Sequence, residues 1–91
     1  MFSLAIHKQF LKDFNKIKFN QTNLEKLFKY ILLLQQEKPL PEEAKDHGLK
    51  GEYQNIRDFH LSGDLIVLYR IDKENMEIQL LRIGSHSQLF K

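Results

Sequence analysis

The C-terminal part of the chain contains three strand-like runs separated by very short connections. The runs cover residues 55–61, 65–71 and 76–83, and only residues 62–64 and 72–75 lie between them. Both connections are rich in Gly, Asn and Asp, which is typical of hairpin loops. Because connections this short join only neighbouring antiparallel strands, the sequence predicts a three-stranded antiparallel meander.

The alternation of apolar side chains predicts how these strands pair. The four-residue loop predicts three apolar pairs on one face: Ile71 with Met76, Tyr69 with Ile78, and Val67 with Leu80. The three-residue loop predicts two more: Leu61 with Leu65, and Phe59 with Val67. Asp58, His60 and Arg82 then share the opposite face of the sheet. Leu80 and Leu81 interrupt the alternation, which predicts a β-bulge at this point.

Two amphipathic helices are predicted before the meander. Apolar side chains recur at helical spacing in two sets: Phe10, Leu11, Phe14 and Ile17, then Leu24, Leu27, Phe28, Ile31 and Leu34. Thr22 and Glu25 have the spacing of a capping box at the start of the second helix. Pro39 and Pro41 predict its end, and a polar loop follows over 38–53. A short strand over 2–6 precedes both helices. We therefore expect an α+β fold over 1–91, a single domain with two N-terminal helices packed on a small twisted antiparallel sheet.

The composition fits a small globular protein of 91 residues, with 42% hydrophobic and 29% charged residues. The absence of cysteine excludes disulfides, a thiolate zinc site and a cysteine nucleophile. The absence of cysteine also fits a reducing compartment, so we expect a cytoplasmic protein. No apolar run approaches the roughly 18 residues of a membrane span. Six lysines lie in the first third of the chain: Lys8, Lys12, Lys16, Lys18, Lys26 and Lys29. Such a block either keeps helices solvated or attracts a polyanion.

Three histidines and one aspartate are the candidates for catalysis. His47 lies in the polar loop, His60 in the first strand of the meander, His86 after the last strand, and Asp64 in the first hairpin loop. These side chains suit either zinc or acid–base chemistry near neutral pH. Neither an HExxH nor an HxH spacing is present, which favours acid–base chemistry without a metal or other cofactor. Asp58 is expected to form an ion pair with Arg57 or Arg70, or to orient a histidine.

Basic residues near these groups suit a phosphate: Lys50, Arg57 and Arg82. Phe90 either packs the tail or stacks on a base. Histidines with cations fit cleavage of an RNA backbone, in which one group deprotonates the 2′-hydroxyl, another protonates the departing 5′-oxygen, and a cation stabilises the phosphorane.

Four short segments, in order and spacing, resemble the YafQ-type branch of the RelE/ParE superfamily of bacterial type II toxins. They are Asp46-His47-Gly48-Leu49-Lys50-Gly51, Arg57-Asp58-Phe59-His60 with Asp64, Leu68-Tyr69-Arg70-Ile71, and the closing motif over 81–90. The resemblance implies a RelE-like fold and an endoribonuclease that cuts mRNA, usually at the ribosome, and is silenced by a cognate antitoxin.

By motif position, the resemblance implies a catalytic set of His47, His60, Asp64 and His86. His86 would be the proton donor, and either His60 or Asp64 the general base. Lys50, Arg57, Arg82 and Phe90 would contact RNA, Arg82 at the scissile phosphate and Phe90 at a base. An acidic antitoxin segment is expected on the basic helix surface. Two alternatives remain: a ParE-type toxin that poisons gyrase without catalysis, and an RNA-binding module that does not cleave.

Overall fold

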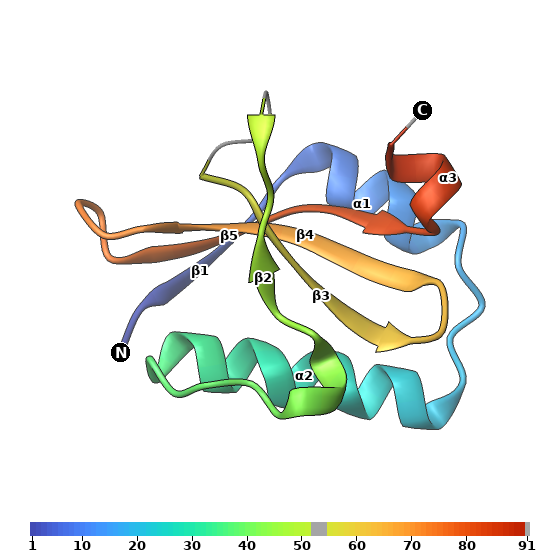
Figure 1. Cartoon of the computed structure of the whole chain (residues 1–91), viewed down its shortest axis with the longest axis horizontal. Coiled ribbons are helices and arrows are strands. Elements are labelled where there is room, and N and C mark those ends of the chain that lie inside the picture. The colour runs from blue at the N-terminus through green and yellow to red at the C-terminus, as the bar shows by residue number, and fades with distance from the viewer. Residues whose placement is uncertain (52–54, 91) are drawn as a thin grey trace.

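A computed structural model describes residues 1–51 and 55–90, and its centre is a five-stranded sheet (Figure 1). The strands are β1 (Ser3–Ile6), β2 (His47–Gly48), β3 (Arg57–Ser62), β4 (Leu65–Asp72) and β5 (Glu77–Gly84), in the spatial order β1-β5-β4-β3-β2. The predicted meander β3-β4-β5 is confirmed. β1 adds a parallel pair with β5, so the sheet is mixed. Parallel neighbours require a long connection, and the helical segments between β1 and β5 provide it.

In the described residues, three α-helices pack around this sheet: α1 (Lys8–Asn15), α2 (Gln21–Gln35) and α3 (His86–Leu89). Figure 1 shows α2 running along one side of the sheet and α3 lying on the other side, near the C-terminus. The main core joins α1 and α2 to the sheet through buried side chains that include Phe10, Leu27, Tyr30, Phe59, Val67, Tyr69 and Leu80. The predicted α+β architecture is confirmed. No helix in the described part of the chain is long and apolar enough to cross a membrane.

The structure differs from the sequence prediction at the start of α2 and in the loop predicted over 38–53. The predicted capping box at Thr22 is wrong, because Asn20 is the N-cap and its side chain accepts from the Asn23 amide at 2.7 Å. A capping box does form at α3, between Ser85 and Gln88. The segment predicted as a loop holds the short 3₁₀ helix η1 (Glu42–Ala44) and β2. The part of that prediction over 52–53 lies outside the described residues.

The register of the first hairpin is correct at one pair and wrong at the next. Phe59 pairs with Val67 as predicted. Leu65, however, pairs with Ser62 rather than Leu61, because the register shifts between His60 and Ser62. The extra residue leaves a shorter loop than the sequence suggested.

The second hairpin is displaced by two residues from the prediction. Ile71 pairs with Ile78 and Tyr69 with Leu80, while Val67 pairs with Ile83, a shift of three because the bulge at Leu81 adds one residue. Met76 has a φ of 51°, so it belongs to the turn, and the first pair beyond the turn is Asp72 with Glu77. The turn still has four residues, now 73–76, and the Asp72 carboxylate stabilises it by accepting from the Asn75 backbone and side chain. A shift of two residues keeps Tyr69, Ile71, Ile78 and Leu80 on their predicted face, whereas Met76 leaves that face for the turn.

The face away from the main core carries the polar groups of interest. The predicted bulge occurs at Leu81, since Leu80 pairs with Tyr69 and Arg82 with Leu68. Leu68 in turn lies opposite Asp58. Asp58 and Arg82 therefore share this face, as predicted. A second, smaller core of Ile66, Leu68 and Leu89 joins α3 to it.

Candidate active site

A buried carboxylate, Asp58, lies at the centre of the polar face. Asp58 is only 3% exposed. Its Oδ1 lies 3.1 Å from His47 Nδ1 and 3.8 Å from His60 Nε2. Among the described residues this buried oxygen has no hydrogen-bond partner. Burial raises the pKa of the Asp58 carboxyl, although the nearby positive charges of His47, His60 and His86 oppose that increase. Of the two expectations for Asp58, the geometry favours contact with histidines over an ion pair with arginine.

His47 is held at the sheet edge by β2. It pairs with Asp58 across β2 and β3, and its side chain is about half exposed. His47 Nδ1 also lies 2.8 Å from the carbonyl oxygen of Lys45. A carbonyl can only accept a hydrogen bond, so in the neutral imidazole Nδ1 carries the hydrogen. The lone pair then lies on Nε2, the atom directed away from this bond, and a general base needs such a lone pair.

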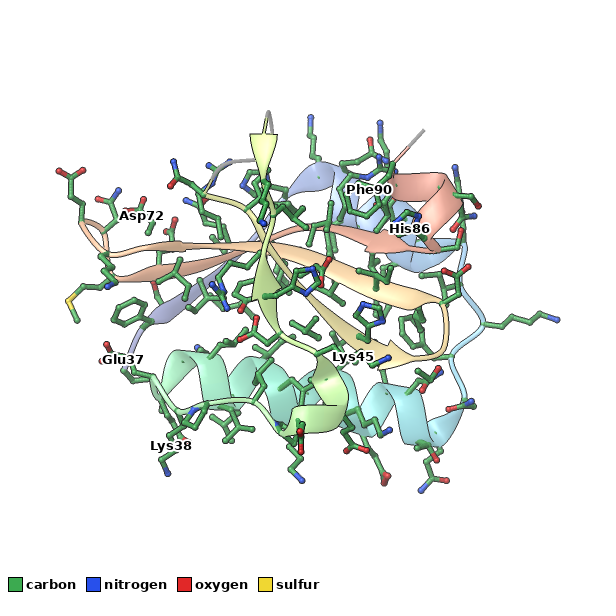
Figure 2. All side chains as sticks on the ribbon, in the orientation of Figure 1. Glu37, Lys38, Lys45, Asp72, His86 and Phe90 are labelled. Carbon is green, nitrogen blue, oxygen red and sulfur yellow. The ribbon has the colours of Figure 1, made fainter. Side chains whose placement is uncertain are left out.

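His86 is the first residue of α3, and Phe90 follows the last. Their ring centroids lie 4.8 Å apart, and Figure 2 shows the two side chains together at one end of the sheet, with Asp72 at the other. Asp64, in the turn between β3 and β4, accepts the backbone N–H of His86 at 3.0 Å. The Asp64 carboxylate therefore anchors the start of α3. The His86 side chain remains exposed.

Arg82 forms a bidentate ion pair with Asp13 on α1. Its Nε and Nη2 donate to the two Asp13 oxygens at 2.9 and 3.0 Å. Asp13 also accepts from the Ile83 amide at 3.1 Å and from the side chain of Gln9. Burial alone would raise the pKa of Asp13, but these hydrogen bonds outweigh it and the pKa is lowered. The Arg82 guanidinium is thus fixed in orientation, while its side chain stays 36% exposed.

The two remaining predicted RNA contacts lie near β2, and Arg57 is on the sheet face opposite to Asp58, paired with Tyr69. Lys50 is exposed beyond β2. Arg57 contacts Tyr69 and Asp46. Sequence reasoning missed Asp13, Asp46 and Tyr69 as partners of the basic residues. The sequence contained one signal for the Arg82 partner, since Asp13 is the only acidic residue among the first 24.

Within 1–51 and 55–90, no group of three or more His, Cys, Asp or Glu side chains could hold a metal ion.

The fold and the site together define a small α+β protein with imidazoles and a carboxylate gathered on one sheet face. Residues 2–91 match the family described as "Bacterial toxin of type II toxin-antitoxin system, YafQ". The chain belongs to this family. This confirms the class suggested by the sequence motifs.

Three relatives illustrate the similarity. The mRNA interferase toxin YafQ of Escherichia coli strain K12 is 34% identical over 79 residues, covering 87% of this chain and 74% of that protein. A metal-bound toxin from Helicobacter pylori is 39% identical with a TM-score of 0.88, covering 99% of this chain and all of that one. The toxin in the E. coli DinJ-YafQ toxin-antitoxin complex is 29% identical with a TM-score of 0.81, covering 98% and 97%. The predicted enzyme class, an mRNA interferase, is confirmed by the curated relative.

Proposed function

We propose that this toxin cuts mRNA by general acid–base catalysis that requires no metal ion. The observation that carries the proposal is the contact of His47 and His60 with the buried Asp58 carboxylate, on the face where His86 lies. The 2′-oxygen of the RNA attacks the adjacent phosphorus after losing its proton to a base. The bond to the 5′-oxygen breaks as an acid protonates it. The products are a 2′,3′-cyclic phosphate and a free 5′-hydroxyl.

The contacts support separate roles for the site residues. His47 is the general base, because its bond to Lys45 leaves the lone pair on Nε2. His86 is the general acid, since its exposed ring lies beside Phe90, whose ring offers a stacking surface for a base. Asp58 and His60 orient His47 and stabilise the charge it acquires. Asp64 positions His86 through its backbone.

The basic residues of the site support binding of the scissile phosphate. Asp13 occupies Nε and Nη2 of Arg82, which leaves Nη1 outside the ion pair. A fixed guanidinium edge suits the developing charge on a phosphorane, since it needs no reorganisation during the reaction. Lys50 supplies a further exposed charge. The substrate is mRNA, held at the ribosome in the cytoplasm.

Replacing Asp64 separates positioning from proton transfer. Asp64→Asn keeps an oxygen acceptor for the His86 amide, so kcat should remain close to that of the wild type. His47→Gln removes the base and should lower kcat by about 10²–10⁴-fold. The assay is cleavage of a defined RNA in excess chelator.

Two outcomes of this assay contradict the proposal. If Asp64→Asn loses as much activity as His47→Gln, then Asp64 is the base. If the wild type loses its activity in chelator and regains it with stoichiometric zinc, the reaction depends on a metal.

Asp58→Asn should make the protein more stable and less active. Because burial raises the pKa of Asp58, its contribution to stability is lost as the pH rises through the ordinary and the raised pKa. The neutral amide avoids that loss. We therefore expect Asp58→Asn to raise Tm at pH 8, by about 4–8 °C for each 1 kcal/mol gained, and the gain to vanish near pH 3. A thermal melt at both pH values measures this, and a lower Tm at pH 8 would contradict it.

A cognate antitoxin is the second partner that we propose. An apolar groove of about 360 Å³ lies between α1, α2 and the edge strand β1. Its lining includes Leu4, Ile6, Leu11, Phe14, Phe28 and Leu32. Phe28 is 63% exposed and Leu11 49%, although both were expected on buried helix faces. A cell that makes this enzyme must keep it inactive, and the groove offers an apolar docking surface for the protein that does so.

A further inference from the structure

Three side chains from separate segments form a hydrogen-bonded network near β2, in which Arg57 and Tyr69 lie on the sheet face opposite to Asp58. The Tyr69 hydroxyl on β4 donates to Asp46 Oδ1 at 2.5 Å. Arg57 Nε on β3 donates to the same hydroxyl at 3.2 Å, and Arg57 Nη2 lies 3.4 Å from Asp46 Oδ1. We call these three residues the Asp46 network.

The Asp46 network includes the residue directly before β2, the strand that carries His47. β2 has only two residues, and its pairing with β3 consists of His47 with Asp58 and Gly48 with Arg57. One further backbone bond follows, from the Leu49 amide to the Ile56 carbonyl at 2.8 Å. So short a strand has little pairing energy of its own, and side-chain contacts at its start matter more.

The hydrogen bonds and the ion pair of the Asp46 network are expected to persist at neutral pH. Tyr69 is fully buried, and burial together with the hydrogen bond to Asp46 raises the pKa of its phenol. The phenol therefore remains a donor. The Arg57 guanidinium balances the Asp46 carboxylate, which would otherwise add a second negative charge near Asp58.

We propose that Asp46, Arg57 and Tyr69 are positioning residues that hold β2 on the sheet and thereby set His47 against Asp58. The inference rests on the proposed role of His47. It changes the interpretation of Arg57, which the sequence suggested as an RNA contact. Arg57 acts through Asp46 on the position of His47.

Hydrogen exchange tests the positioning without any need for cleavage. Tyr69→Phe removes only the hydroxyl and keeps the ring packed against Phe59, whose centroid lies 5.5 Å away. We expect exchange of the Leu49 amide to become about 10-fold faster in this variant. The His7 amide, which donates to Leu80 on the other side of the sheet, should be unchanged. Asp46→Asn keeps an acceptor for Tyr69 and should protect Leu49 better than Asp46→Ala.

RNA binding and turnover test the new role of Arg57. Arg57→Gln should lower kcat by about 10- to 100-fold, because His47 is displaced. Its RNA affinity and the salt dependence of that affinity should match the wild type. Arg70→Gln is the matched control, since Arg70 lies on the neighbouring strand and contacts Gln79 instead.

Two results would overturn the inference. One is unchanged Leu49 exchange in Tyr69→Phe. The other is an Arg57→Gln variant that binds RNA more weakly and has a salt slope reduced by about one, the result expected for a lost phosphate contact. If the wild type cuts no RNA at all, the proposed function fails, while the exchange result still decides whether the network holds β2.

Discussion

His86→Ala should lower the rate of RNA cleavage by about 10²–10⁴-fold, the usual cost of removing a general acid. Induced expression of the wild-type toxin should arrest growth, and the variant should relieve that arrest. Folding should be unaffected, because the imidazole is exposed and α3 is held by its backbone contact with Asp64 and by Ser85. The loss is therefore expected in kcat, with little change in Tm.

The measurement compares growth curves, circular dichroism and cleavage for the wild type and two variants. His7→Ala is the matched control, because His7 is also an exposed histidine next to a helix start and its side chain makes no capping bond. The wild type should show a bell-shaped pH profile, because catalysis needs one neutral and one charged imidazole. A folded His86→Ala protein that remains fully toxic would exclude the acid role.

The fold could be predicted where the signals are local. The period-two pattern from Phe59 to Ile83 and the short loops between the strands were sufficient for the meander and for the face of each side chain. The register of the second hairpin was wrong because Met76 adopts a left-handed backbone, which moves it into the turn. The parallel pairing of β1 with β5 joins segments more than 70 residues apart, and no local pattern encodes it.

The site could be predicted only as a set of residue types. Histidines and an aspartate stood out because few other side chains transfer protons near neutral pH. Their partners did not, because each depends on tertiary contacts. Asp13 meets Arg82 across 69 residues of sequence. Asp58 contacts His47 only because β2 docks on β3, and Asp46 and Tyr69 take part in that docking.

Phe28→Asp should weaken binding of the antitoxin by about 30- to 1000-fold. Phe28 lies in the apolar groove and is 63% exposed, so its replacement removes little core packing from the free toxin. An aromatic side chain at the centre of an interface commonly contributes about 2–4 kcal/mol to binding. A carboxylate there would be left buried and unpaired when the antitoxin docks. We therefore expect faster dissociation rather than slower association.

The lysines beside the groove predict the opposite kinetic effect. Lys8, Lys12 and Lys16 are exposed along α1, and their field would attract the acidic antitoxin segment that the sequence suggests. Reversing these three charges together should slow association at low salt and leave dissociation nearly unchanged, because long-range steering is screened by salt.

Binding kinetics at low and high salt separate the two contributions. Met76→Asp is the control for Phe28→Asp, because Met76 is 52% exposed and lies outside the groove lining. Coexpression supplies a second readout, since the antitoxin should no longer rescue growth from Phe28→Asp while it still rescues Met76→Asp. Wild-type affinity for the Phe28 variant would show that the antitoxin docks elsewhere. The apolar groove would then be unoccupied in the complex. Because the lysines mainly speed association, another apolar contact would have to account for slow dissociation of the antitoxin.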